Sequence, residues 1–367
     1  MKVGIITFHA SHNYGSMLQA YALQQTVISL GHDCDIINFR TQRQRQGYLP
    51  FYCGRRLRGK IKALLFPRLA WERRNKYRMF ESFLRNNYTL SQSEYHTNAD
   101  LCNAEMDYDV YISGSDQIWN TSCFDFDWAY YLNFVKRGKK IAYAPSMGPK
   151  ATLEIASSMF GKIKQYAESY DSVSVREQGT AELFQQITGK EVPITLDPTL
   201  LLPFEQWSEL AGDTPVIEGD YILLYIPWYD KRLYAKAEEI AAEFGVKVVC
   251  TLGDYAQQYR NNPNFMFYTA VGPLQFLNIA KFSRFIVCAS FHAVVFSIVF
   301  KKPFYAYNGM EDNRIQQLLR LTALEKYCKS PERNILNEPS QDFDIAQSKL
   351  ETARSMSMDF LRESIDS

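Results

Sequence analysis

Short apolar stretches alternate with longer amphipathic stretches along most of the chain. Lys2–Phe8 is an apolar run of strand length, and the polar residues 9–15 follow it. Ser16–Leu30 then places apolar residues at helical spacing as far as Gly31, a plausible helix stop, and Cys34–Phe39 is again a short apolar run. This order predicts a strand, a helix and a second strand parallel to the first.

The same alternation continues beyond this first unit, which is typical of mainly parallel sheets with helices on both faces. Further strands are predicted at Tyr108–Ser113, Ile141–Tyr143, Ser172–Val175, Pro193–Leu196, Tyr221–Ile226, Val246–Leu252, Arg284–Cys288 and Pro303–Tyr307. Further helices are predicted at Leu153–Ser169, Glu177–Thr188, Lys231–Phe244, Gly272–Ala280, Phe291–Phe300, Asn313–Leu321 and Asp342–Ser367.

Proline and glycine gather between Asp197 and Gly219, which indicates a domain boundary. We therefore expect an α/β protein with two Rossmann-like domains, each built on a parallel sheet. Residues 1–205 form the first domain, 206–330 the second, and 331–367 a helical tail that could brace them. The active site is expected in the interdomain cleft, lined by loops at the carboxyl ends of strands.

Composition restricts the class of protein. The seven cysteines are odd in number and never spaced as CxxC, which argues against a disulfide framework and a structural zinc site. The apolar run after Lys2 is too short for a secretory signal, and no stretch approaches the length of a membrane span. These features predict a cytoplasmic protein. The 14% aromatic content suits sugar-stacking surfaces as well as cores, and we favour the core.

Charge is unevenly distributed although the net charge is only +1. Residues 40–85 hold 14 Lys/Arg against the two acids Glu72 and Glu81. Leu57, Ile61 and Trp71 lie among these cations, a mixture that fits the surface of an anionic membrane. A solvated helix is the alternative, and no nucleic-acid-binding module accompanies the charge. We expect peripheral contact with the inner membrane face and no nucleic-acid partner.

The strongest candidate site is the segment from Cys288 to Phe300. An apolar strand runs into a helix that is apolar nearly all round, with Ser290 at the N-cap position and His292 in the first turn. A helix N-terminus favours a phosphate or carboxylate, and an imidazole there can donate a proton to it. A core histidine is the alternative.

Two polar loops follow predicted strands and are further candidates. The loop at 9–16 carries Gly15, which lets a ligand approach the backbone, but it lacks the dinucleotide-binding pattern GxGxxG. The segment 113–120 clusters hydrogen-bonding groups, with Trp119 as a stacking face. A plain turn, or Asp116 acting only as a helix N-cap, would explain the same residues.

Arg176 directly follows a strand, and its guanidinium fork suits a carboxylate or phosphate, although a surface position is the simpler interpretation. The chain has no P-loop, nucleophile elbow or HExxH motif, and its carboxylates form no convincing metal cluster.

Four segments together resemble the polysaccharide pyruvyl transferase family. They are Asn13–Tyr21, Gly114–Asn120, Ser174–Glu177, and Ser290–His292 followed by Lys302–Phe304. They come in the family's order at comparable spacing, and the likeness extends from residue 1 to about 325. The pairs Asp197-Pro198 and Asn313-Arg314 also look like family positions.

The resemblance implies two domains of the glycosyltransferase-B type. It also implies transfer of pyruvate from phosphoenolpyruvate onto two hydroxyls of a sugar as a cyclic ketal, in polysaccharide or exopolysaccharide biosynthesis. His292 would be the general acid and Arg176, Ser290 and Arg314 would bind the donor. The substrate-binding residues would be Asn13, Tyr14, Gly15, Ser16, Gly114, Ser115, Asp116, Gln117 and Trp119. No metal or cofactor is required besides phosphoenolpyruvate as co-substrate.

One departure from the family pattern concerns the charge of the site. Better-known members carry an arginine two positions before the histidine, where this chain has Ser290, and we expect Arg314 to replace that cation. The acceptor is expected to be a glycan or its lipid-linked precursor. A nucleotide-sugar glycosyltransferase of the same architecture and a non-catalytic, membrane-associated anion-binding module are the alternatives.

Overall fold

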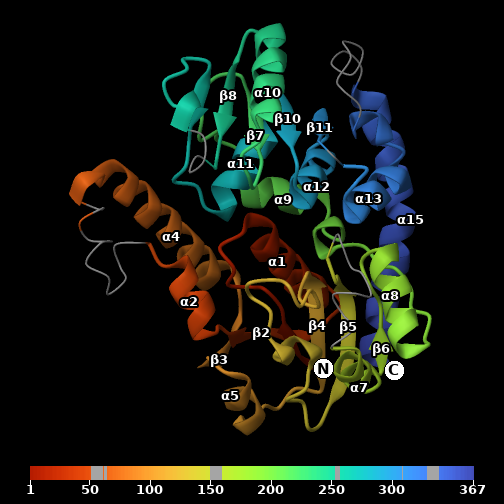
Figure 1. Ribbon diagram of the computed structural model, residues 1–367. Helices are drawn as coiled ribbons and strands as arrows, with labels where there is room; N and C mark the ends of the chain where they lie inside the picture. The colour runs from red at the N-terminus through yellow and green to blue at the C-terminus, as the bar shows by residue number, and fades with distance from the viewer. Residues whose placement is uncertain (51–60, 62–63, 149–158, 253–256, 308, 329–338) are drawn as a thin grey trace. The chain divides into compact units, whose positions relative to one another are not determined.

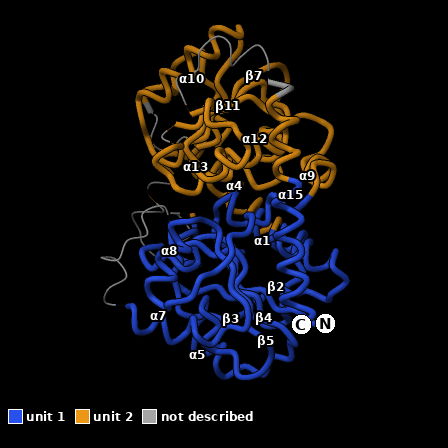
Figure 2. Tube along the Cα trace, turned by 90° about the vertical axis from the view of Figure 1, so that its right-hand side faces the viewer, with its two compact units in different colours: residues 1–49, 84–202, 351–367 blue, residues 50–83, 203–350 orange. Residues whose placement is uncertain are grey.

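The computed structural model describes residues 1–50, 61, 64–148, 159–252, 257–307, 309–328 and 339–367 (Figure 1). The chain divides into two compact units, coloured separately in Figure 2. Unit 1 consists of Met1–Leu49, Leu84–Leu202 and Glu351–Ser367, and unit 2 of Pro50–Phe83 and Pro203–Leu350.

The units differ in two respects from the domains that we expected. The chain leaves unit 1 at Leu202, near the expected 205, but residues 50–83 group with unit 2, and the tail contributes to both units. The reason for the first difference is packing. Glu72 accepts a hydrogen bond from Thr269 at 2.7 Å, and a Cβ on Gly272 would lie 2.5 Å from the Cβ of Met79.

Unit 1 is a parallel sheet with helices. Its described strands have the order β3-β2-β1-β4-β5-β6, and all adjacent pairs are parallel. The strands are β1 (Lys2–Ile6), β2 (Asp33–Phe39), β3 (Leu90–Tyr95), β4 (Val110–Asp116), β5 (Lys139–Pro145) and β6 (Ser172–Val173). The helices are α1 (Tyr14–Ser29), α2 (Gln42–Tyr48), α5 (Asn98–Asn103), η1 (Trp128–Tyr131), α7 (Phe160–Ala167), α8 (Gln178–Thr188) and η3 (Pro198–Leu200).

Unit 2 repeats this plan with a second parallel sheet. Its described strands have the order β11-β10-β7-β8-β9. They are β7 (Tyr221–Tyr225), β8 (Lys247–Cys250), β9 (Phe265–Phe267), β10 (Phe285–Cys288) and β11 (Phe304–Ala306). The helices are α9 (Phe204–Ala211), α10 (Lys231–Phe244), η4 (Gln257–Tyr259), α11 (Pro273–Phe282), α12 (Phe291–Val299), α13 (Asn313–Thr322) and η5 (Glu325–Cys328). Two long helices, α4 (Pro67–Asn87) and α15 (Pro339–Asp366), contribute residues to both units.

The predicted fold class is confirmed: the protein has two Rossmann-like units with parallel sheets. Individual elements differ from the prediction. The expected strand at Pro193–Leu196 is only an isolated bridge between Ile194 and Val175. The edge strands β3 and β9 were not predicted. Residues 153–158 of the expected helix Leu153–Ser169 lie outside the described residues, and α7 accounts for its second half.

Each sheet contains one point where the strand order reverses. In unit 1 this point lies between β1 and β4, and in unit 2 between β7 and β10. The connections leaving such a pair diverge to opposite faces, so their loops leave a crevice beyond the carboxyl ends of the strands. The predicted loops after β1, β4 and β10 all lie at these two points.

The high aromatic content is explained largely by the cores. The largest fully buried side chains are mostly rings, among them Trp119, Tyr130, Tyr131, Trp207 and Tyr221. In unit 2, Trp207 of α9 packs edge-on against Phe296 of α12, with ring centroids 5.1 Å apart. Among the described helices, none carries a stretch long and apolar enough to cross a lipid bilayer.

The tail is helical, as predicted, and α15 has a core face in each unit. Phe343, Ala346 and Leu350 are buried in its first half, and Leu361 and Ile365 in its second half. The second half therefore belongs to the core of unit 1, far in sequence from the rest of that unit.

We expect Leu361→Ala to lower the free energy of unfolding by about 2–5 kcal/mol, because it removes a fully buried side chain and leaves a cavity. Denaturant unfolding measures this change. Met356 lies on the same helix but is 69% exposed, so Met356→Ala is the control and should change stability by less than about 0.5 kcal/mol. Equal effects of the two substitutions would contradict the assignment of this half of α15 to the core.

Candidate functional site

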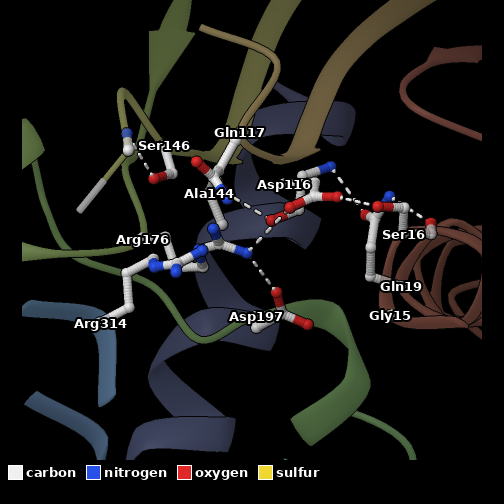
Figure 3. Close-up of polar contacts among 12 residues, drawn as sticks. Gly15, Ser16, Gln19, Asp116, Gln117, Ala144, Ser146, Arg176, Asp197 and Arg314 are labelled. Atoms are coloured by element: carbon white, nitrogen blue, oxygen red, sulfur yellow. Dashed lines mark hydrogen bonds and ion pairs between the residues drawn. The ribbon is translucent and has the colours of Figure 1, made fainter. Parts of the chain in front are cut away.

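The loops after β1 and β4 are joined by buried hydrogen bonds (Figure 3). Ser16 Oγ, in the first turn of α1, donates to Asp116 Oδ2 at 2.6 Å. Gln19 Oε1 accepts from the backbone N–H of Ser115 at 3.2 Å, and its Nε2 donates to Thr7 Oγ1 at 2.9 Å. Two segments about a hundred residues apart in the sequence therefore form one polar cluster at the strand reversal of unit 1.

The first turn of α1 has mainly local roles. Asn13 is the N-cap, and its Oδ1 accepts from the N–H groups of Gly15 and Ser16 at 2.9 and 3.3 Å. Tyr14 is only 2% exposed. Of the four residues predicted here for substrate binding, the structure thus places Ser16 in the polar cluster, leaves Asn13 exposed as the cap, and directs Tyr14 into the protein.

The end of β4 requires glycine at position 114. Gly114 has a φ of +144°, and a Cβ there would lie 1.9 Å from the carbonyl oxygen of Tyr143 on β5. The peptide bond between Gly114 and Ser115 is cis. Asp116 has a φ of +72°, in the left-handed region that non-glycine residues rarely adopt. Residues held in such conformations concentrate at functional sites, which supports the prediction for this turn.

The guanidinium of Arg176 lies beside three carboxylates and does not project toward a ligand. Its Nη1 lies 2.8 Å from Asp197 Oδ2 and 3.6 Å from Asp116 Oδ1, and its Nε lies 3.5 Å from Glu177 Oε2 (Figure 3). The Arg176 side chain is 2% exposed. Its predicted role as a direct clamp on the donor therefore does not fit this structure, because the guanidinium is enclosed and already paired.

The charges around Arg176 are held by further donors. Burial lowers the pKa of Arg176, but the carboxylates of Asp197, Glu177 and Asp116 outweigh it and raise that pKa overall. Glu177 Oε1 accepts from Ser146 Oγ at 2.7 Å and from Thr180 Oγ1. Asp197 Oδ1 accepts from the Thr199 hydroxyl at 2.6 Å. One cation among three carboxylates gives this end of unit 1 an acidic character, stabilised by neutral donors.

The last two predicted residues of the loop after β4, Gln117 and Trp119, lie in different environments. Gln117 is half-buried, and its Oε1 accepts from Asn120 at 3.0 Å. Trp119 is 1% exposed and stacks on Tyr131 and Phe184, with ring centroids 5.0 and 5.8 Å away. Its predicted role as a stacking face for a sugar is therefore wrong, because both faces of the indole are covered by core rings.

In unit 2, the ends of the adjacent strands β10 and β11 carry the other predicted residues. Ser290 is the N-cap of α12, but its side chain makes no capping hydrogen bond, and His292 occupies the second helical position with 8% exposure. Arg314, in the first turn of α13, lies 5.8 Å from the ring centroid of Phe291. Two helix N-terminal turns, a histidine and an arginine are thus neighbours within unit 2.

Arg314 is held in place by the N-cap of its own helix. Asp312 accepts from Arg314 Nε at 2.9 Å and from Nη2 at 2.6 Å, and its Oδ1 also accepts from the Arg314 backbone N–H at 3.0 Å. The pair involves Nε and Nη2 and leaves Nη1 outside it. Bidentate pairing fixes the plane of the guanidinium.

The described residues contain no group of three or more His, Cys, Asp and Glu side chains arranged to hold a metal ion. The sequence of residues 13–309 matches the family model of the polysaccharide pyruvyl transferases. The chain belongs to this family. It is a transferase of polysaccharide biosynthesis, and the family implies a polysaccharide or sugar acceptor.

Solved structures show the same fold at low sequence identity. UDP-GlcNAc 2-epimerase from Methanocaldococcus jannaschii is 12% identical, with a TM-score of 0.50 over 97% of this chain and 99% of that chain. The S. aureus MnaA–UDP co-structure is 10% identical, with a TM-score of 0.51 over 94% and 90%. A search among curated proteins finds no sequence match. These likenesses establish the two-unit fold of this pyruvyl transferase family member.

Two of the three carboxylate partners of Arg176, Glu177 and Asp197, were not predicted as site residues, whereas Asp116 was predicted for substrate binding. Glu177 and Asp197 both stood in segments that carry the family resemblance, and that was the available signal. Nothing in the sequence indicated that Asp197, 21 positions away, or Asp116, 60 positions away, would pair with the same guanidinium.

We expect Asp197→Ala to lower the free energy of unfolding by about 3–5 kcal/mol, because it leaves the buried Arg176 without its nearest counter-ion. Thermal or denaturant unfolding measures the loss. The exposed pair of Arg284 and Asp220 provides the control, and Asp220→Ala should cost less than about 1 kcal/mol. If Asp197→Ala lowered the free energy of unfolding no more than Asp220→Ala, the buried Arg176–Asp197 pair would not be a source of stability.

Proposed function

We propose that the protein transfers pyruvate from phosphoenolpyruvate onto two hydroxyls of a sugar as a cyclic ketal, with His292 as the general acid. The observation that carries the proposal is the position of His292. It lies in the first turn of α12, at the strand reversal of unit 2, beside the neighbouring helix start that bears Arg314. Membership of the pyruvyl transferase family supports the reaction class.

The electrostatics of the two units support a division of the substrates between them. Phosphoenolpyruvate carries a phosphate and a carboxylate, which suit helix N-termini, the fork of Arg314 and the Ser290 hydroxyl. The cluster in unit 1 has three carboxylates around Arg176 and would repel that polyanion. Sugar hydroxyls are neutral donors and acceptors, so they suit the side chains of Asp116, Gln117 and Ser16.

The reaction needs a proton donor and a binding site for the phosphate that leaves. His292 gives a proton to the methylene carbon of phosphoenolpyruvate, which becomes a methyl group and leaves cationic character at the central carbon. One sugar hydroxyl attacks that carbon and a second replaces the phosphate. Of the two hydroxyl protons released, one restores the proton of His292 and the other leaves with the phosphate. The net result is one ketal and one inorganic phosphate. The free backbone N–H groups at the start of α12 stabilise the departing phosphate.

Arg176 has a different role in this proposal from the one that the sequence indicated. It is a positioning residue, since its guanidinium faces Asp116 at 3.6 Å while Ser16 holds the other carboxylate oxygen. Fixed from both sides, Asp116 is oriented to accept a proton from a sugar hydroxyl.

We also propose that the acceptor is a lipid-linked sugar met at the cytoplasmic surface of an anionic membrane. The charge of residues 40–85 supports this step. The cations Arg55, Arg56, Arg58, Lys60 and Lys62, on which the expectation first rested, lie outside the described residues.

Incubation with phosphoenolpyruvate and a panel of free and lipid-linked sugars should release inorganic phosphate and add pyruvate to the acceptor. We expect His292→Ala to slow this release at least about a hundredfold, since loss of a general acid costs about 10²–10⁴ in rate. His32 lies in the turn before β2, so His32→Ala is the matched control and should retain activity. Full activity of His292→Ala would exclude it as the acid.

Ligand-induced stabilisation distinguishes this function from nucleotide-sugar transfer. Phosphoenolpyruvate should raise the melting temperature of the wild-type protein, because a ligand that binds only the folded state stabilises it, and UDP or GDP should not. Stabilisation by a nucleotide diphosphate without any effect of phosphoenolpyruvate would favour a glycosyltransferase instead.

A further inference from the structure

One face of α4 presents cations and an aromatic ring to solvent. Arg68, Trp71, Arg74 and Arg78 follow one another at spacings of three or four residues, so they line one side of the helix. All four are exposed, and Trp71 is 61% exposed. We call these four residues the basic face of α4.

The acids of α4 leave two of the three cations of this face, Arg74 and Arg78, without a carboxylate partner among the described residues. Glu72 is drawn toward the body of unit 2, where Thr269 donates to it at 2.7 Å, and its other oxygen pairs with Arg68 at 3.2 Å. Glu81 is only 9% exposed. The opposite side of the helix is apolar and buried at Phe80 and Phe83. Arg74 and Arg78 therefore extend from a side of the helix that bears no exposed carboxylate.

Large exposed apolar side chains precede α4 in the chain. Leu64 is 81% exposed, Leu65 68%, Phe66 53% and Ile61 48%. A cluster of exposed apolar residues bordered by charge marks an interaction surface, since leaving it in water is unfavourable. Trp71 adds an exposed ring among the cations of α4.

We propose that the basic face of α4, together with Ile61, Leu64, Leu65 and Phe66, binds the surface of an anionic lipid bilayer. Arginine heads pair with lipid phosphates, while leucine, phenylalanine and tryptophan enter the boundary between headgroups and acyl chains. Nucleic acid would match the cations but would leave the adjacent aliphatic side chains exposed. The inference depends on the proposed function only for its purpose, which is to bring the enzyme to a lipid-linked acceptor.

Vesicle flotation tests the inference with the full-length protein. The wild-type chain should float with vesicles that contain phosphatidylglycerol and should not float with phosphatidylcholine alone. Each cation removed near the surface should weaken partitioning about fivefold, so Arg74→Glu with Arg78→Glu should weaken it at least about 25-fold. Trp71→Ser with Leu64→Ser should also weaken it, and this loss should persist at high salt because the contact is apolar.

The matched control changes the same charge elsewhere. Lys190 and Lys247 are exposed and lie on other elements, so Lys190→Glu with Lys247→Glu should leave flotation near the wild-type level. Phosphate release with a water-soluble acceptor should be unchanged in all these variants, which separates failure of this inference from failure of the proposed activity.

Several results would overturn the inference. One is equal flotation of the wild-type protein and the Arg74/Arg78 variant, and another is an equal loss in the Lys190/Lys247 control. A third is retention on duplex DNA without flotation, which would identify nucleic acid as the partner. A fourth is dissociation of a wild-type oligomer by Trp71→Ser without any vesicle binding, which would make this face an interface between copies of the chain.

Discussion

All paired strands in both sheets run parallel, and the rest of the architecture depends on that constraint. Parallel strands all end at the same edge, so each connection must return across a face of the sheet, usually as a helix. Where the strand order reverses, the loops separate and leave polar backbone that nothing in the sheet covers. Both units reach this geometry, one between β1 and β4 and the other between β7 and β10. The loops that carry Ser16, Asp116 and His292 leave the strands at those points.

The two reversal points differ in their charged groups, although the topology of the sheets is the same. In unit 1 the buried Arg176 is outnumbered by Asp116, Glu177 and Asp197, and hydroxyl donors satisfy the surplus oxygens. Burying such a group is expensive unless every charge is paired or hydrogen-bonded, so its main effect is to fix geometry rather than to add stability. A rigid acidic cluster and a helix start bearing a paired arginine suit substrates of different charge, which supports the donor and acceptor that we propose.

The sequence revealed the buried strands and the loops after them because both leave local signals. Val110–Asp116 and Phe285–Cys288 are buried throughout and stand out as apolar runs followed by small polar residues. The edge strand β3 reads Leu-Ser-Gln-Ser-Glu-Tyr and is largely exposed, so no burial pattern marks it. Trp119 was misjudged for a related reason. Its ring is buried against Tyr131 and Phe184, residues distant in sequence, and no local pattern indicates those contacts.

Ser290 illustrates how a site can retain an arginine donor when one position loses it. The resemblance to better-known pyruvyl transferases places a cation two residues before the histidine, and this chain has a hydroxyl there. Arg314 restores a cation from the next strand–helix unit, where Asp312 orients it and Phe291, adjacent to His292, lies beneath it. Asp312 offsets the full charge of Arg314, so the pair offers a directed hydrogen-bond donor rather than a free cation. Such a donor binds a planar carboxylate better than it attracts a diffuse polyanion. On this argument Arg314 would hold the donor's carboxylate, and the start of α12 would hold its phosphate.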